Sequence, residues 1–296
     1  PASPYLQEIC ALLVSKMPAE QAEPVAARFG LDLSRCFLHD EAHRQGLQAQ
    51  AARTEALAQL DTWEQLQGLN AAAGPPSALF TLVIEIDAWN IRERDHWGQT
   101  AAFRAQGQPL SRWHWVYVGT VFRLDHRGHT AGQRPLISQR GSVATRQGLE
   151  ALMRQLSREA LARGLGQAQE VLVLADGAVW IWNAFADRFP EARQRLDLWH
   201  ADEHLWEVAH DLYGRGSPEA RAWVAPLLQA VRDDQPRQVI QTLSELQPRL
   251  TDALHKKLQT QIEYFQSHEH RMKYKDVIDA RKACEAGTPT AAQKEL

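Results

Sequence analysis

The sequence has few cysteines, and they follow none of the patterns that would make them structural. Only 3 occur among 296 residues, at Cys10, Cys36 and Cys284, and no two form a Cys-x-x-Cys pair. An odd, scattered set argues against a disulfide scaffold and against a cysteine zinc site. This usage is typical of a reducing compartment, so a cytoplasmic location is expected.

Long hydrophobic runs are also absent. No apolar stretch reaches the roughly 18–20 residues that a membrane-spanning helix needs, and the longest, Ala78–Ile86, is interrupted by Thr81 and Glu85. The N-terminus has no basic patch followed by an apolar core, so no secretory signal peptide is predicted. The sequence therefore predicts no membrane partner.

The chain lacks a strong excess of charge of either sign, with a formal net charge of −3. The distribution is nevertheless uneven. Residues 1–75 carry 5 Lys and Arg against 9 acids, residues 80–150 carry 9 against 6, and residues 255–275 carry 5 against 2. A phosphate-binding surface needs only a local positive potential. Charge alone, however, favours ordinary surface scatter over such a surface.

The composition is otherwise that of an ordinary globular protein, with an excess of tryptophan. Hydrophobic residues make up 44% and charged residues 23%, so the chain can bury a core and wholesale disorder is excluded. Tryptophan occurs 10 times, and most of these side chains are expected in the core or covering a sheet. Those beside predicted strand ends are Trp89, Trp113, Trp115, Trp180, Trp182 and Trp199.

Residues 1–75 are predicted to form an N-terminal helical domain. Periodic apolar residues and caps such as Ser34 and Gly30 predict helices over 5–16, 21–29, 35–47 and 50–67. Helix, short turn and helix outline a helix-turn-helix, although any helical hairpin looks the same and the acidic balance argues against DNA contact. The composition of residues 70–77 indicates a linker.

After the linker the pattern changes to strands, then to strands alternating with helices. The expected strands are Leu79–Asp87, Trp113–Phe122, Arg134–Arg140, Glu170–Asp176 and Arg195–His200, and the expected helices are Gly148–Arg163, Trp180–Phe189 and broken segments from Ala201 to about Lys282. Three consecutive strands, followed by strands that alternate with helices, predict an α/β fold with a mixed sheet covered by helices.

Two carboxylates stand where chemistry is expected in such a sheet. Asp87 ends the first predicted strand and Asp176 ends the buried fourth one. Ligand sites lie beyond the carboxyl ends of strands, where two facing carboxylates are costly unless a cation neutralises them. Hard oxygen ligands suit Mg²⁺ or Mn²⁺, and a pair of such ions supports in-line attack on a phosphodiester. Separately, each Asp could simply cap a turn or a helix.

Other side chains near these positions are weaker candidates for site residues. Glu85 points to the same face as Asp87 and is either a further ligand or a half-buried partner of an arginine. Asp197 and His200 could support the site or brace the sheet end. His200 and His204 have a spacing that suits zinc, but no Glu directly follows the first His, so the zinc-protease motif fails.

Several spaced motifs occur together. They are Val171–Asn183 (VLVLADGAVWIWN), Phe189–Ala192 (FPEA), Leu196–Leu205 (LDLWHADEHL), Tyr264-Phe265 and His270–Tyr274 (HRMKY). In this order they resemble the DDE transposases of bacterial insertion sequences, specifically the ISKra4-like group. Val83–Asp87 resembles the strand with that family's first catalytic Asp, although Ala88 stands where the family more often has Gly. The resemblance covers roughly residues 75–280.

The resemblance implies an RNase H-like fold with helices on both faces of the sheet and an all-α insertion after the second catalytic Asp. The expected parts are the N-terminal domain 1–75, a core over 76–204, a helical insertion over 205–263 and a C-terminal helical segment over 264–296. It also implies DNA strand cleavage and strand transfer at insertion-sequence ends. Asp87 and Asp176 would be the catalytic metal ligands, holding two Mg²⁺ or Mn²⁺ ions.

The implied partner is double-stranded DNA, both transposon ends and target, in a nucleoid-associated cytoplasmic protein. A homo-oligomer is expected because transposases commonly act as multimers on paired ends. The basic end of the helical insertion would contact phosphates. Its residues are Lys256, Lys257, Arg271, Lys273 and Lys275.

The family's third acid is not found in its usual motif. It belongs to a Gly-Ser-Gly-x-x-Glu segment soon after the HRMKY stretch, and neither Glu285 nor Glu295 matches it. Three interpretations stay open: a chain cut before that acid, an inactive or domesticated homologue that binds DNA without cutting, or substitution by Glu85, Glu285 or Glu295. A metal-dependent nuclease of the same fold, without strand transfer, is a further alternative.

Overall fold

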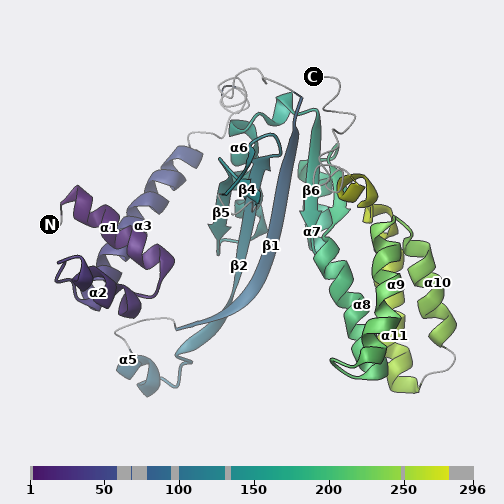
Figure 1. Cartoon of the computed structure of the whole chain (residues 1–296). Coiled ribbons are helices and arrows are strands. Elements are labelled where there is room, and N and C mark those ends of the chain that lie inside the picture. The colour runs from purple at the N-terminus through teal and green to yellow at the C-terminus, as the bar shows by residue number, and fades with distance from the viewer. Residues whose placement is uncertain are drawn as a thin grey trace. The chain divides into compact units, whose positions relative to one another are not determined.

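The computed structural model describes residues 3–58, 68, 79–94, 100–130, 135–247 and 251–279. Over these residues the chain is an α/β protein with N-terminal helices, a mixed five-stranded sheet and a C-terminal helical region (Figure 1). It divides into two compact units, 1–68 and 69–296. No helix in the described ranges is long and apolar enough to cross a membrane. The predicted linker, Glu285 and Glu295 lie outside the described residues.

The N-terminal unit contains α1 (Pro4–Lys16), α2 (Ala19–Arg28) and α3 (Arg35–Ala58). Its small core contains Cys10, Ala22 and Leu38, which are fully buried. Ser34 caps α3 as predicted, since its Oγ accepts a hydrogen bond from the Phe37 N–H (3.2 Å). The prediction of separate helices over 35–47 and 50–67 is wrong in its first boundary. One helix runs through to Ala58, because no Gly or Pro interrupts the chain between 47 and 50.

The main sheet has the strand order β5-β2-β1-β6-β7. Its strands are β1 (Thr81–Arg94), β2 (Ser111–Arg123), β5 (Gly141–Thr145), β6 (Glu170–Ala175) and β7 (Arg193–Leu196). The pairs β1–β2 and β2–β5 are antiparallel, whereas β1–β6 and β6–β7 are parallel. The predicted α/β class with a mixed sheet is therefore confirmed, and this arrangement is compatible with an RNase H-like fold.

Three strand predictions need correction. The first predicted strand ends at Asp87, but β1 continues to Arg94 because it stays paired with β2, so Asp87 lies within a strand. The sequence predicts that residues 134–140 form the third strand of the sheet, but β4 (Pro135–Ile137) pairs with β3 (Arg127–His129) in a separate two-stranded sheet. The third strand of the main sheet is β5, which the sequence patterns do not predict. The last predicted strand, 195–200, ends at Leu196. Asp197 is the N-cap of a helix there, because its side chain accepts a hydrogen bond from the Trp199 N–H (2.9 Å).

The part of the central strand β1 that pairs with β6 is largely buried on both faces. Leu82 and Ile84 belong to the main core, which includes residues of α6 (Leu149–Ala162) and α7 (Val179–Arg188), whereas Val83 packs with Phe122 and Leu172 on the other side. Burial on both sides explains the nearly continuous apolar run. Helix α6 lies close to β2, where a Cβ added at Gly119 would be 2.7 Å from Leu156 Cδ2.

The C-terminal helices share the core of the sheet. They are α8 (Leu198–Tyr213), α9 (Pro218–Arg232), α10 (Pro236–Leu246), α11 (Asp252–His268) and the short η3 (Glu269–Arg271), and two further short helices are α5 (Thr100–Ala105) and η1 (Leu165–Gln167). One hydrophobic cluster continues from the sheet through Leu205, Phe265 and Met272. The predicted insertion boundaries at 204 and 263 fall within α8 and α11, and the division into those parts stays a prediction.

Strands β1 and β2 extend beyond their neighbours. They pair with each other as far as Arg94 opposite Ser111, but β6 pairs with β1 only up to Glu85, and β5 pairs with β2 only from Tyr117. Residues 89–94 and 111–116 therefore form a two-stranded extension, here called the ribbon, which leads to the segment containing α5 (Figure 1).

The tryptophan prediction is wrong for four of the six residues. Trp89, Trp113 and Trp115 lie on the ribbon with exposed fractions of 45%, 65% and 52%. Trp199, at the start of α8, is also exposed. Only Trp182 is buried, and Trp180 is half-buried against the core. The first three lie on the ribbon, where the described residues of β5 and β6 no longer flank β1 and β2.

Candidate functional site

The two predicted aspartates meet at one end of the sheet. The last β1–β6 pair is Glu85 with Leu174, and Asp87 and Asp176 each follow two residues later on these parallel neighbours. Both line one hollow of about 300 Å³. Its polar lining residues are Glu85, Asp87, Thr120, Asp176, Asp197 and His200. The structure thus brings together the two predicted ligands, Glu85 and both predicted supporting residues, while their catalytic roles stay predictions.

Local hydrogen bonds orient the three aspartates. Asp87 Oδ1 accepts from the Ala88 N–H (2.7 Å), and Asp176 Oδ1 accepts from the Ala178 N–H (2.9 Å). Asp197 caps α8 with one oxygen, and its other oxygen lies 2.9 Å from His200 Nδ1. Asp87 and Asp176 therefore each have one carboxylate oxygen bonded to a backbone amide, whereas both carboxylate oxygens of Asp197 have a partner.

The carboxylates in the hollow influence one another. Glu85 is half-buried, and its burial, together with the charge of Asp197, raises the pKa of its carboxyl group. Among the described lining residues there is no Lys or Arg to compensate. The uncompensated negative charge at this sheet end attracts cations.

The donor set suits a magnesium ion better than a zinc ion. Within the described ranges, no three His, Cys, Asp or Glu side chains are grouped so as to hold a metal ion by themselves. Magnesium usually keeps several waters and is held by one or two carboxylates together with substrate phosphates. Asp87 and Asp176 are two carboxylates that line one hollow, and metal binding by them stays a prediction. The histidines of the rejected zinc motif have other partners, since His204 Nδ1 lies 2.7 Å from Gln261 Oε1 and His200 faces Asp197.

Helix α11 holds the turn that follows Asp176. The Tyr264 hydroxyl donates a hydrogen bond to the Asp176 backbone oxygen (3.1 Å), and the Tyr264 ring stacks on His204 with centroids 3.7 Å apart. Gly177 has φ +104°, and a Cβ there would be 3.0 Å from Tyr264 Cε2 and 3.1 Å from His268 Nε2. Burial and the nearby charge of Asp176 raise the pKa of Tyr264, which keeps the hydroxyl a donor. The sequence shows Tyr264 only as part of a motif and does not predict this role.

Tyr264 and His268 of α11 both lie against Gly177 and are here called the clamp; His268 is its buried histidine. Arg271 Nη1 donates to His268 Nδ1 (3.1 Å), so Nε2 carries the proton and faces Gly177. Burial lowers the pKa of His268 to about 4, and the neighbouring charges of Arg271, His270 and His204 act in the same direction. The imidazole is therefore neutral in the folded protein at neutral pH.

This burial predicts a loss of stability in acid. The unfolded chain takes up a proton at His268 near its ordinary pKa of 6.5, whereas the folded protein does so only near 4. The free energy of unfolding should therefore decrease as the pH falls from 6.5 to about 4, by up to about 3 kcal/mol from this group. Urea titrations at several pH values measure it. His268→Gln should flatten the dependence in this window, and an unchanged slope would contradict the assignment.

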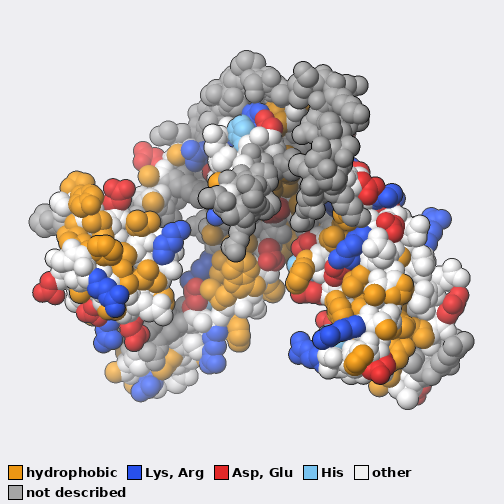
Figure 2. Space-filling model, in the orientation of Figure 1, with side chains coloured by type: hydrophobic (Ala, Val, Ile, Leu, Met, Phe, Trp, Pro, Cys, Tyr) orange, Lys and Arg blue, Asp and Glu red, His pale blue; other side chains and the backbone are white. Residues whose placement is uncertain are grey.

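The predicted DNA-contacting residues differ in their surroundings. Lys256 and Lys273 are exposed, whereas the ammonium group of Lys257 is 2.9 Å from Asp211 and that of Lys275 is 2.8 Å from Asp279. Arg271 turns inward, donating to Gln194 Oε1 (2.8 Å) with its guanidinium 4.4 Å from the Trp182 ring centroid. Basic and acidic side chains are interspersed over the C-terminal helices (Figure 2). Their contact with DNA stays a prediction.

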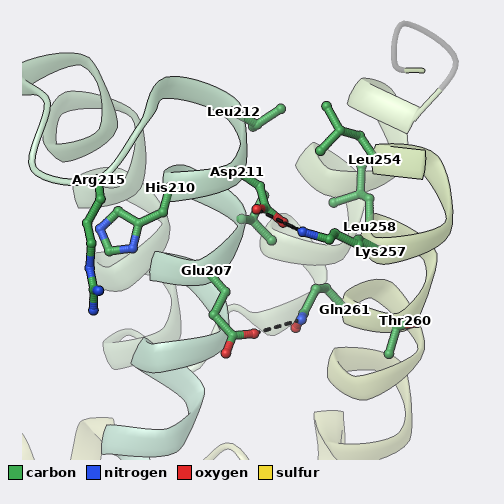
Figure 3. Close-up of a pocket in the computed structure, with 11 residues that line it drawn as sticks. Glu207, His210, Asp211, Leu212, Arg215, Leu254, Lys257, Leu258, Thr260 and Gln261 are labelled. Carbon is green, nitrogen blue, oxygen red and sulfur yellow. Dashed lines mark hydrogen bonds and ion pairs between the residues drawn. The ribbon is translucent and has the colours of Figure 1, made fainter. Parts of the chain in front are cut away.

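A larger hollow of about 550 Å³ lies between α8 and α11 (Figure 3). Leu254 and Leu258 line it on the α11 side. Two polar contacts link the helices across it: Lys257 with Asp211, and the Gln261 amide with Glu207 (3.2 Å). Because its charged groups largely pair with each other, the smaller hollow at the sheet end is the better candidate for chemistry.

The fold and this hollow define a class: an α/β protein whose mixed sheet places one aspartate within β1 and one just after β6, both lining one hollow beyond the last pair of these parallel strands. No protein-family model matches the sequence, and no curated protein matches it significantly.

Proposed function

We propose that this chain is a DNA transposase of the DDE type, similar to the ISKra4-like group, which cleaves DNA strands at insertion-sequence ends and transfers them to a target. The observation that carries the proposal is the position of Asp87 and Asp176, two residues beyond the last pair of two parallel strands and lining one hollow. The strand order, compatible with an RNase H-like fold, supports it.

In this proposal the chain positions the reacting groups and provides the charged side chains that would bind the metal ions. Asp87 and Asp176 would hold two Mg²⁺ or Mn²⁺ ions through the oxygens that their backbone hydrogen bonds leave available. Bound ions of this kind stabilise both the attacking and the leaving oxygen of an in-line displacement at phosphorus. A water would attack first, and the released 3′-hydroxyl would then attack target DNA. Tyr264 and His268 would keep the turn bearing Asp176 in place.

A non-catalytic DNA-binding protein of the same fold is the second candidate. It is favoured by one observation: within the described residues, no three His, Cys, Asp or Glu side chains are grouped so that they could hold a metal ion. A nuclease that hydrolyses without strand transfer is the third. Under either alternative the sheet end keeps its acidic character, but no joined product is formed.

One assay distinguishes the transposase, the non-catalytic DNA-binding protein and the nuclease. The chain is incubated with Mg²⁺, a labelled duplex ending in the element's terminal sequence and an unlabelled target plasmid. A transposase yields label joined to the target, a nuclease yields only shortened label, and a binding protein yields a complex without new ends. Robust cleavage by this chain would mean that Glu85, Glu285 or Glu295 completes the site. Omission of Mg²⁺ is the control.

A further inference from the structure

The ribbon carries a row of aromatic side chains on one face. Trp113 and Trp115 are two residues apart on β2 and therefore point to the same side. Trp115 is 6.5 Å from Tyr117 between ring centroids, and Tyr117 meets the Trp180 ring edge-on at 5.7 Å. The row thus begins half-buried at Trp180, four residues after Asp176, and ends in solvent at Trp113.

One basic residue, Arg92, accompanies this row. Arg92 lies directly opposite Trp113 in the β1–β2 register and is exposed. Its Nε donates to Ser111 Oγ (2.9 Å), which holds the guanidinium along the face that bears the tryptophans. The acid of the described ribbon, Glu93, points to the opposite face and pairs with Arg146 (2.5 Å). The aromatic face therefore combines exposed indole rings with a positive charge.

The ribbon begins at the candidate site. Asp87 and Arg92 are five residues apart on one strand, a span of about 17 Å at roughly 3.3 Å per residue. A DNA strand of about five nucleotides of duplex rise covers the same distance. Because five residues separate them, Asp87 and Arg92 point to opposite faces of β1. A nucleic acid with its reacting phosphate at the sheet end therefore reaches the exposed tryptophans by crossing the edge of β1 beyond Glu85, where β6 no longer pairs with it.

We propose that the ribbon face formed by Arg92, Trp113 and Trp115 binds unpaired nucleotides of the DNA that enters the site, an inference that rests on the proposed function. The two indole rings stack on bases, and Arg92 contacts a phosphate. Stacking on aromatic side chains is the usual means by which proteins hold single strands without reading their sequence, and neighbouring arginines supply the backbone contact. Paired bases in a duplex hide their faces, so the preference is for single-stranded DNA.

Fluorescence anisotropy with a labelled single-stranded oligonucleotide and its duplex, in EDTA at fixed salt, tests the surface without chemistry. Trp113→Ala combined with Trp115→Ala should weaken single-strand binding about tenfold or more, and duplex binding less. Replacing both by Phe keeps aromatic faces and should restore most of the affinity. Tyr5→Ala, which removes an aromatic side chain that is 73% exposed in the N-terminal unit, should leave the affinity unchanged.

Unchanged single-strand affinity in the double Ala variant would overturn the proposal, as would a loss that Phe does not repair. If sedimentation shows a dimer that the double Ala variant breaks while its DNA affinity stays the same, the face joins two copies of the chain and the DNA assignment is wrong. The proposed function fails separately. Trp-dependent binding without metal-dependent cleavage, in this chain and in one extended to include a third acid, would keep this surface and reject the transposase proposal.

Discussion

Replacing Asp87 or Asp176 by Asn should abolish Mg²⁺-dependent cleavage, with a fall of about a thousandfold or more, while DNA binding is kept. Asn has the shape of Asp but lacks the charge that holds a metal ion, and an electrostatic contribution of this kind to a transition state is large. Both residues keep a side-chain oxygen that can accept the existing hydrogen bonds from Ala88 and Ala178. The turn geometry should therefore survive, and only the chemistry should suffer.

The comparison needs a preparation that cleaves, either this chain or one extended to include a third acid. Asp187→Asn is the matched control, because Asp187 is an exposed acid on α7 that does not line the hollow. Binding of Mn²⁺ measured by calorimetry should weaken in the Asp87 and Asp176 variants and stay the same in the control. A variant with both substitutions that still cuts would reject the DDE assignment.

Much of the sheet could be predicted because its strands have strong local signals. The buried strands β1 and β6 are apolar runs rich in branched residues, and each run stops at an aspartate, so the sequence alone locates Asp87 and Asp176. The strand β5 escapes prediction because Gly141–Thr145 is short and contains little apolar surface. Its pairing with β2 is set by the neighbouring strand and by α6, not by its own composition.

The end of β7 shows how a local pattern can mislead. The sequence Arg195-Leu-Asp-Leu198 alternates polar and apolar residues like a strand, but Asp197 is also a good N-cap. The cap prevails because the Asp197 side chain accepts a hydrogen bond from the Trp199 N–H and α8 follows at once. That change turns Asp197 and His200 into the hollow as the first turn of a helix.

Other features depend on contacts that no local pattern contains. The hydrogen bond from Tyr264 to Asp176 joins residues 88 positions apart. The exposed tryptophans result from unequal strand lengths, since β1 has 14 residues but β6 has only 6. Composition suggests that tryptophans lie in the core, but composition carries no information on where a sheet ends.

Substitution at Gly177 tests the contacts of Tyr264 and His268 most directly. Gly177→Ala should lower the free energy of unfolding more than the matched change Gly214→Ala. Gly177 has φ +104° and Gly214 has φ +86°, so alanine strains the backbone at both, at a cost of about 1–3 kcal/mol each. A Cβ at Gly214 meets no atom within 4 Å, whereas at Gly177 it would press on Tyr264, His268 and Leu196 at 3.0–3.1 Å. The free energy of unfolding, measured in urea, should therefore fall further for Gly177→Ala than for Gly214→Ala. The additional loss should shrink when Tyr264 is also replaced by Ala, since contacting residues are not additive. Equal losses for the two glycine variants would mean that α11 does not hold the turn bearing Asp176.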